Sequence, residues 1–170
     1  MGSDHVIIRP WQLEDLPAVR LITWQTWLAT YSGFIPKDDL QAYFDSHYNL
    51  AALTELQSST FVNGWVAEIE GDVVGYLKSQ RNEKEKSFQV SSIYVLPAYQ
   101  GKGIGMMLLR EAEACAAAHH FDAIWLGVMV QNVEALAWYK KIGFQFVEEA
   151  PFTMGRTTVS HLIGYKRCSL

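Results

Sequence analysis

Short apolar segments rich in β-branched and aromatic residues recur along the chain, separated by polar turns or by longer stretches. Segments of this length and composition are typical of β-strands. The pattern predicts strands at 6–9, 61–69, 73–80, 88–95, 123–130, 144–147 and 157–167. Two of these strands flank Glu70-Gly71-Asp72, which predicts a hairpin because these residue types favour a tight turn.

Runs of good helix formers fill several of the intervening stretches. They predict a helix at 13–31, a second that Asp38 or Asp39 caps and that reaches about residue 47, a third at 106–119 and a short one after Asn132. Residues 50–57 are expected to add another turn or two. Pro17 falls in the first turn of the first helix, where proline is tolerated.

The predicted elements run in the order βααββαβαββ, which indicates an α/β (α+β) fold. No internal repeat or low-complexity linker divides the chain. With 170 residues, 49% hydrophobic content and 13% aromatic content, a single domain over residues 1–170 can bury a sizeable core.

Composition and charge exclude several classes of protein. The net charge is −4 and the Lys and Arg residues are scattered, which argues against a nucleic-acid-binding surface. No apolar run approaches the roughly 20 residues of a membrane span. Residues 1–5 lack the features of a signal peptide, and Val6 departs from the myristoylation pattern. Cys115 and Cys168 form no metal or redox spacing, so we expect a cytoplasmic protein without a metal.

The most informative local pattern is Gln-Gly-Lys-Gly-Ile-Gly at residues 100–105, between the predicted strand 88–95 and the predicted helix 106–119. Pro97 ends the strand. A glycine-rich turn that opens a helix presents unpaired backbone N–H groups at the positive end of the helix dipole, where a pyrophosphate binds. Glycine leaves these groups accessible to phosphate oxygens. The turn therefore predicts a phosphorylated cofactor.

Two common phosphate-binding loops do not fit this spacing. A dinucleotide-binding Gly-x-Gly-x-x-Gly motif that began at Gly101 would need a small residue where Met106 stands. A P-loop needs Ser or Thr after its Gly-Lys pair, where this chain has Gly103. The pattern that remains is Gln-x-x-Gly-x-Gly over residues 100–105.

A second motif follows the predicted strand 123–130. It reads Asn-Val-Glu-Ala-Leu-Ala-Trp-Tyr-Lys-Lys-Ile-Gly-Phe over residues 132–144. Asn132 is a good N-cap for a short helix, Glu134 suits its first turn, and Gly143 can take the left-handed conformation that ends it.

The two motifs, in this order and at this separation, resemble those of the GNAT superfamily of acyl-CoA N-acyltransferases. The resemblance covers most of the chain. It implies a mixed central sheet with helices on both faces, acetyl-CoA (coenzyme A) as the cofactor and N-acetyltransferase activity.

The same resemblance implies which residues contact the cofactor. Ile93, Tyr94 and Val95, at the end of a strand, would pair with the pantetheine amides. Asn132 and Tyr139 would lie beside the pantetheine and the thioester. The pyrophosphate and the 3′-phosphate would be held by Gln100, Gly101, Lys102, Gly103, Ile104, Gly105 and Met106, and by Lys141. Each lysine also has an explanation without a cofactor. Lys102 fits equally well as a solvated loop residue, and Lys141 fits equally well as a basic residue that interacts with the helix dipole.

Acetyl transfer from a thioester to an amine needs a neutral amine, a polarised carbonyl and a stable leaving thiolate. An alkyl amine with a pKa near 10.4 is only about 0.1% neutral at pH 7. Tyr139 is the candidate general acid, because a phenol of pKa about 10 is suited to protonating a departing thiolate and the family's catalytic tyrosine stands at this place. The alternative is that Tyr139 only packs its helix against the sheet.

The sequence leaves the general base unassigned. The hydroxyl residues Ser91, Ser92 and Tyr94 of strand 88–95 are poor bases. More distant candidates are Glu68 and Asp45, reached through water, and the imidazoles of His47 and His161, although a lone histidine is more often structural.

Trp24, Trp27, Tyr31 and Phe34 form an aromatic series at helical or near-helical spacing. Such a series most often packs into the core. The alternative is that Trp27, Tyr31 and Phe34 form the wall of a substrate site for an alkyl chain or a cation.

Residues 75–78, 93–95, 124–128, 139–141 and 152–155 also resemble the PaiA-type polyamine N-acetyltransferases. An acidic protein attracts a polycation, whereas Arg156 and His161 stand where acidic groups would help to hold one. The leading interpretation is an acetyltransferase for a small-molecule amine, with spermidine or spermine as candidates. A protein N-terminal or lysine acetyltransferase and a non-catalytic acetyl-CoA-binding regulatory module are the alternatives, and a homodimer is left open.

Overall fold

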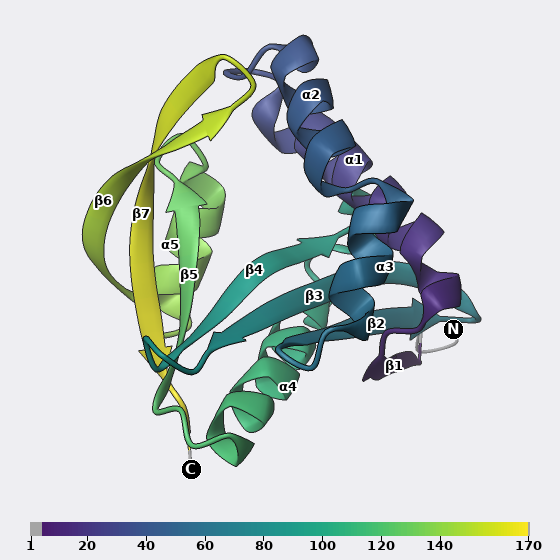
Figure 1. Ribbon diagram of the computed structural model, residues 1–170, viewed down its shortest axis with the longest axis vertical. Coiled ribbons are helices and arrows are strands. Elements are labelled where there is room, and N and C mark those ends of the chain that lie inside the picture. Colours follow the sequence, from purple (N-terminus) through teal and green to yellow (C-terminus); the bar gives the residue numbers. More distant parts are fainter. Residues whose placement is uncertain (1–4, 170) are drawn as a thin grey trace.

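The fold is built on one seven-stranded sheet with the strand order β1-β2-β3-β4-β5-β7-β6 (Figure 1). The computed structural model describes residues 5–169. Residues 1–4, for which the sequence predicts neither a signal peptide nor a myristoylation site, lie outside the described part. Only β4 and β5 pair in parallel and all other neighbours are antiparallel, so the predicted mixed sheet is confirmed. The strands are β1 Val6–Pro10, β2 Val62–Ile69, β3 Asp72–Asn82, β4 Ser87–Val95, β5 Ala123–Met129, β6 Gln145–Met154 and β7 Thr157–Arg167.

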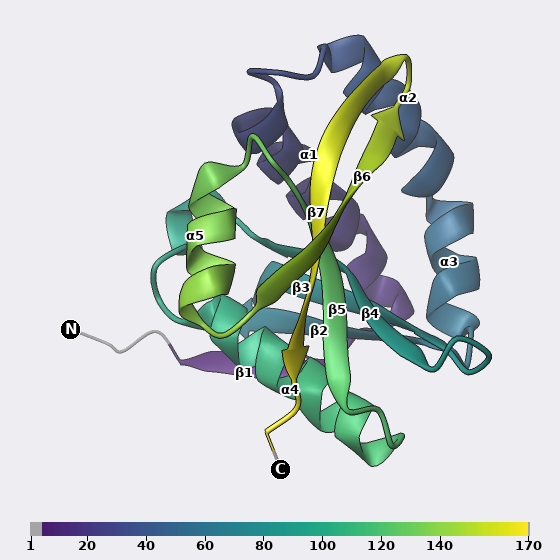
Figure 2. The same cartoon turned by 90° about the vertical axis from the view of Figure 1, so that its left-hand side faces the viewer.

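Helices cover both faces of this sheet, as expected (Figures 1 and 2). One face carries α1, α2 and α3, and the other carries α4 and α5. The helices are α1 Leu16–Tyr31, α2 Lys37–His47, α3 Leu50–Ser58, α4 Ile104–Ala118 and α5 Val133–Lys141, with 3₁₀ turns at Leu13–Asp15 and Pro97–Tyr99. Across residues 5–169, none of the helices is long and apolar enough to span a membrane.

The observed order of elements contains one helix and one strand more than βααββαβαββ. The added helix is α3, where the sequence predicts only another turn or two. It forms a full element because the Asn49 side chain accepts the backbone N–H of Ala52 at 2.8 Å and so caps its first turn. The added strand is among β2, β3 and β4. The sequence predicts each of these three strands by its residue range, but the predicted order counts only two strands at this place.

The predicted cap of α2 is wrong. Pro36 holds the N-cap position, and no side chain caps this helix. The Asp39 carboxylate accepts hydrogen bonds from the β6–β7 turn, 117 residues away, and is therefore not available to the helix.

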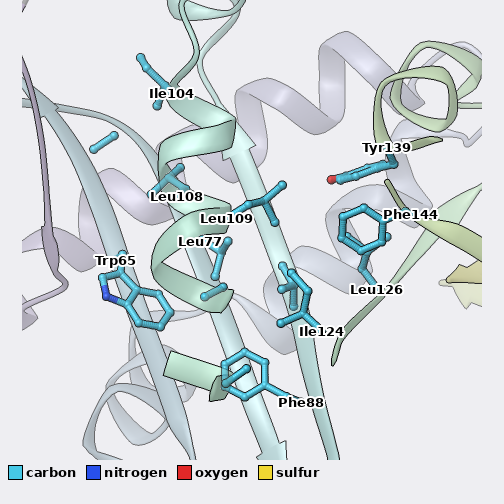
Figure 3. Close-up of a cluster of buried hydrophobic side chains, with 14 of the residues drawn as sticks. Trp65, Leu77, Phe88, Ile104, Leu108, Leu109, Ile124, Leu126, Tyr139 and Phe144 are labelled. Atoms are coloured by element: carbon cyan, nitrogen blue, oxygen red, sulfur yellow. The ribbon is translucent and has the colours of Figure 1, made fainter. Parts of the chain in front are cut away.

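Two hydrophobic cores lie on opposite faces of the sheet, because alternate residues of each strand point to opposite sides. In β2, Trp65 and Ala67 belong to the core under α4, whereas Val62 and Val66 belong to the core under α1, α2 and α3. Figure 3 shows the first core, in which α4 packs its leucines against the strands. Full burial of such a side chain stabilises the fold by about 1.5–3 kcal/mol, so the two cores fix the helices on both faces.

Candidate functional site

The parallel strands β4 and β5 separate soon after they meet. Their ladder pairs Gln89 with Trp125, and beyond this point the strands diverge (Figure 1). A cleft of about 620 Å³ occupies the opening. The end of β4, the glycine turn, β5, the start of α5 and the C-terminal half of α1 line it. The edge of β4 that faces the cleft thus offers backbone groups to a ligand, as the predicted pantetheine contacts require.

A β-bulge in the pairing of β4 with β3 lies close to the place where β4 diverges from β5. Ser92 lies opposite Lys78 and Val90 lies opposite Ser79, so Ser91 is the extra residue. The Ser91 hydroxyl donates to the carbonyl of Lys78 at 3.1 Å. A bulge bends and twists its strand, and this one turns the cleft-lining end of β4, which carries Ile93, Tyr94 and Val95, away from β5.

The glycine turn has the backbone conformation that an anion site needs. Gly101 and Gly103 have φ of +76° and +82°, and Gly103 is the N-cap of α4. A Cβ built on either residue meets no atom within 4 Å, so the space in front of the turn is open. Residues 104–106 form the first turn of α4, where backbone N–H groups have no acceptor within the helix. The turn is therefore suited to bind phosphate oxygens.

The two long side chains of the turn both contact nearby residues, and Gln100 lines the cleft whereas Lys102 does not. The Gln100 amide donates to the carbonyl of Val95 at 2.9 Å, so this side chain ties the turn to the end of β4. The Lys102 ammonium lies 5.6 Å from the centre of the Tyr99 ring. Of the predicted turn contacts, the cleft is lined by Gln100 itself and by Gly101, Gly103, Ile104, Gly105 and Met106.

Helix α5 forms the opposite wall. Asn132 caps it as predicted, since its side-chain oxygen accepts the backbone N–H of Ala135 at 3.4 Å. Gly143, with φ of +111°, follows its C-terminal end as predicted. Asn132 and Tyr139 line the cleft, whereas Lys141 is exposed in the last turn and lies outside it.

Tyr139 is buried in this wall and is 8% exposed. Its ring packs against Phe144, with centroids 5.3 Å apart, and its hydroxyl points away from α5 (Figure 3). Burial raises the pKa of this phenol well above its usual value, and the nearby Tyr94 adds to the rise. The hydroxyl is therefore protonated at neutral pH and is a potential proton donor, so packing and chemistry are compatible roles for this residue.

None of the four predicted distant bases lines the cleft. Glu68 accepts a hydrogen bond from Nε of Arg9 at 2.9 Å, and Asp45 accepts one from Gln41 at 2.8 Å. His47 stacks on Tyr43 with ring centroids 4.0 Å apart. His161 lies behind Gly127 on β7, and burial lowers its pKa. Within residues 5–169, the carboxylate that lines the cleft is that of Glu134, which is exposed. The sequence predicts Glu134 only as an acidic residue in the first turn of its helix.

The predicted aromatic wall is present only in part. Tyr31 lines the cleft, and burial raises its pKa to about 12. Trp27 is 2% exposed and packs on Tyr48, with ring centroids 5.1 Å apart, so it belongs to the core. Phe34 packs on Tyr31 at 5.8 Å from outside the cleft. The sequence missed Thr26, Ala29 and Thr30 of α1 and Gln131, because their side chains carry no distinctive signal.

Ser92 connects the cleft to buried hydroxyl groups of the core under α1, α2 and α3. Ser92, which lines the cleft, shares a hydrogen bond of 2.7 Å with Tyr48, and Thr23 shares one with Tyr76. Burial raises the pKa of Tyr48 and of Tyr76 above the usual phenol value. No Lys or Arg is among the described residues that line the cleft, so the site is neutral apart from Glu134.

Comparison with known proteins gives a family match. The model of the acetyltransferase (GNAT) family matches residues 20–144. N-acetylaspartate synthetase of Xenopus tropicalis is 34% identical over 83 residues, which are 49% of this chain and 31% of that protein. The chain thus spans about a third of this relative. An uncharacterised N-acetyltransferase of Mycobacterium tuberculosis is 26% identical over 121 residues, 71% of this chain and 77% of the relative.

The fold also matches solved structures. The PaiA N-acetyltransferase of Thermoplasma acidophilum, solved in complex with coenzyme A, superposes with a TM-score of 0.84. The match covers 96% of this chain and 99% of the other, at 22% sequence identity, so the likeness is one of fold.

Proposed function

Because the chain belongs to the acetyltransferase (GNAT) family, whose members are acyltransferase enzymes that use acetyl-CoA, we propose that it transfers an acetyl group to a primary amine of a small molecule. The amine attacks directly, and Tyr139 acts as the general acid. The observation that carries this proposal is the opening between β4 and β5, which has the glycine turn at its rim and Tyr139 in its wall.

The residues of the cleft fit acetyl-CoA. Gly101 and Gly103 leave open space in front of the first-turn N–H groups of α4, where the pyrophosphate would bind. The free edge of β4 at Ile93 and Val95 would pair with the pantetheine amides, and Asn132 faces it from α5. When bound, acetyl-CoA supplies the thioester whose acetyl group is transferred.

Tyr139 supplies the proton for the leaving thiolate. Its Oη is protonated at neutral pH because burial disfavours the phenolate. A phenol held in this state keeps its proton until the thiolate departs, and it can then donate that proton to the thiolate sulfur through a hydrogen bond. The acceptor also has to release a proton, and we assign no side chain to that step, since the lining carboxylate Glu134 is exposed.

Spermidine and spermine are the leading acceptors in this proposal. The protein carries a net charge of −4, which attracts polycations. A polyamine bound by one amine needs an anionic partner for its next ammonium group, and Glu134 is in the cleft wall. A Glu134→Gln variant should then raise the KM for spermidine more than the KM for a simple monoamine.

The test is release of the coenzyme A thiol from acetyl-CoA in the presence of spermidine, spermine, small monoamines, amino acids and a short peptide with a free N-terminus. Saturable release with a small amine supports the proposal, and release with the peptide alone would favour the protein acetyltransferase. Tight binding of acetyl-CoA without release for any acceptor would favour the regulatory module. Acetyl-CoA without an acceptor is the control for hydrolysis.

A further inference from the structure

Three tyrosine side chains from three different elements meet in the cleft. Tyr31 ends α1, Tyr94 is near the end of β4, and Tyr139 is in α5. All three line the cleft. The side chain of Tyr31 is in polar contact with that of Tyr94, and Tyr94 in turn adds to the rise in the pKa of Tyr139. We call these three residues the tyrosine cluster.

The tyrosine cluster joins the two faces of the sheet through the gap between β4 and β5. Tyr31 and Tyr94 pack with the core under α1, α2 and α3. Tyr139 belongs to the opposite core, under α4. Tyr94 alternates along β4 with Ile93 and Val95, which pack against that opposite core, so its ring projects toward α1 while the backbone edge of β4 stays free.

The surroundings of the tyrosine cluster hold no cation that would stabilise a tyrosinate. The other titratable groups that affect these pKa values are the phenols of Tyr43 in α2 and Tyr48 just after it. Lys78 contacts the ring of Tyr48, but among the described residues no Lys or Arg lines the cleft. The carboxylate of Glu134, at the start of α5, is exposed.

This neutral environment limits the proton chemistry of the cluster to exchange. Burial raises the pKa of Tyr31 to about 12 and that of Tyr94 well above the usual phenol value, so neither residue is a phenolate at neutral pH. A neutral hydroxyl is both a donor and an acceptor of hydrogen bonds. It can therefore take up one proton only while it gives up its own.

We propose that the tyrosine cluster is a closed proton relay, which carries the proton released by the acceptor amine to the thiolate that leaves. The inference rests on the acetyl transfer proposed above, in which the proton of the amine has no assigned acceptor. A relay of this kind explains how a cleft without a buried carboxylate or imidazole in its lining releases that proton.

The relay leaves every phenol as it began. As the amine nitrogen forms its bond to the acetyl carbon and the C–S bond breaks, with its electron pair on sulfur, the N–H proton passes to Oη of Tyr31. The hydroxyl proton of Tyr31 passes to Tyr94, and that of Tyr94 passes to Tyr139. The hydroxyl proton of Tyr139 passes to the sulfur. No charge remains in the cleft, and solvent supplies and receives no proton.

The experiment compares Tyr31→Phe and Tyr94→Phe with Tyr43→Phe as the matched control. Tyr43 is a half-buried tyrosine whose pKa burial also raises, but it does not line the cleft. The acceptor is the small amine that the wild type prefers. We expect kcat to fall about tenfold to a hundredfold in each relay variant, while the Kd for acetyl-CoA changes less than about twofold. Tyr43→Phe should leave both quantities unchanged.

Two further measurements separate a relay from a structural role. In mixtures of H2O and D2O, kcat of the wild type should follow a curved dependence on the deuterium fraction, because several protons move together. Each relay variant should follow a straight line, because a single proton moves. Imidazole in the buffer should raise kcat of the relay variants by accepting the proton of the amine, and it should not affect the wild type or Tyr43→Phe.

Unchanged kcat in Tyr31→Phe and Tyr94→Phe would overturn the relay and leave Tyr139 as the general acid. A fall in kcat without imidazole rescue and with the curvature retained would also overturn it, since the hydroxyls would then only support the fold. If the wild-type protein binds acetyl-CoA but acetylates no acceptor, the proposed function itself fails. Circular dichroism and thermal unfolding establish that each variant is folded.

Discussion

The indole of Trp138 lies against the backbone of Gly105. A Cβ built on Gly105 would come within 3.1 Å of Cη2 of Trp138 and within 3.4 Å of Cζ2. Gly105 belongs to the first turn of α4 and Trp138 to α5, so this contact sets how closely the two walls of the cleft approach. The third glycine of the turn is therefore required by packing, whereas Gly101 and Gly103 are required by their positive φ.

Replacement of Gly105 by Ala should weaken acetyl-CoA binding more than it changes stability. Alanine is favoured over glycine in a helix by about 1 kcal/mol, which offsets the strain of moving the half-buried Trp138 by a few tenths of an ångström. We expect the free energy of unfolding to change by less than about 1 kcal/mol and the Kd for acetyl-CoA to rise about three- to tenfold. Gly33→Ala is the control, because its Cβ meets nothing within 4 Å. Equal Kd values for the two variants would contradict the prediction.

A Tyr139→Phe variant should keep acetyl-CoA binding and lose turnover. The substitution removes only the hydroxyl and leaves the ring on Phe144. We expect kcat to fall about a hundredfold or more, as for the loss of a general acid, with the Kd for acetyl-CoA nearly unchanged. Tyr165→Phe on β7, where the hydroxyl bonds Gln145, is the matched control. Retained turnover in Tyr139→Phe would remove the catalytic assignment.

Lys78→Met should stabilise the protein at pH 7. Lys78 is 8% exposed on β3, its ammonium lies 5.0 Å from the centre of the Tyr48 ring, and burial lowers its pKa to about 8. Between about pH 8 and the unfolded value of 10.5, the unfolded chain binds more protons than the folded one, so wild-type stability rises with pH. At pH 7 the full penalty of burying the charge is present, and its removal should add about 1–3 kcal/mol.

Urea unfolding of the Lys78→Met variant and the wild type at pH 7, 9 and 10.5 measures this effect. The difference in unfolding free energy should shrink as the pH rises, because the buried amine becomes neutral. Lys84→Met, in the exposed loop between β3 and β4, is the control and should show no such trend. A difference that stays constant over this range would rule out desolvation of Lys78 as its cause.

Stability should fall steeply above pH 10 because several tyrosines are buried. Burial raises the pKa of Tyr31 to about 12 and also raises that of Tyr94 well above the usual phenol value. Above pH 10 the unfolded chain loses phenol protons that the folded chain keeps, so the folded state loses stability as the pH rises. Each such tyrosine contributes up to about 1.4 kcal/mol per pH unit. Unfolding monitored by tyrosinate absorbance measures this slope, and a Tyr31→Phe variant should show a smaller one.

Local features of the site could be predicted from the sequence. The positive φ of Gly143, the Asn132 cap and the last strand at 157–167 are all present as expected. Each depends on hydrogen bonds or backbone conformations within a few residues, which local residue types specify. Which face of a helix lines the cleft is harder to predict from the sequence than these local features. Trp27 and Tyr31 are on the same helix, yet only Tyr31 lines the cleft, because packing against the sheet decides how α1 is rotated.

Partners that are distant in the sequence were missed for the same reason. The sequence offers Glu68 as a candidate base, but the pairing of β1 with β2 brings it to Arg9, which binds its carboxylate. Asp39 was expected to cap α2, but the β6–β7 turn takes both of its oxygens. Neither partner lies within the reach of a local pattern.

The sequence by itself determined the order of most elements, the glycine turn that opens α4 and the Asn132 cap of α5, because these are short-range features of the backbone. Only the tertiary structure decided where β4 and β5 separate, that Tyr139 is buried in the cleft wall, and that Asp39 binds the β6–β7 turn. These features depend on how segments far apart in the chain are held by the two cores, and packing of complete side chains fixes that arrangement.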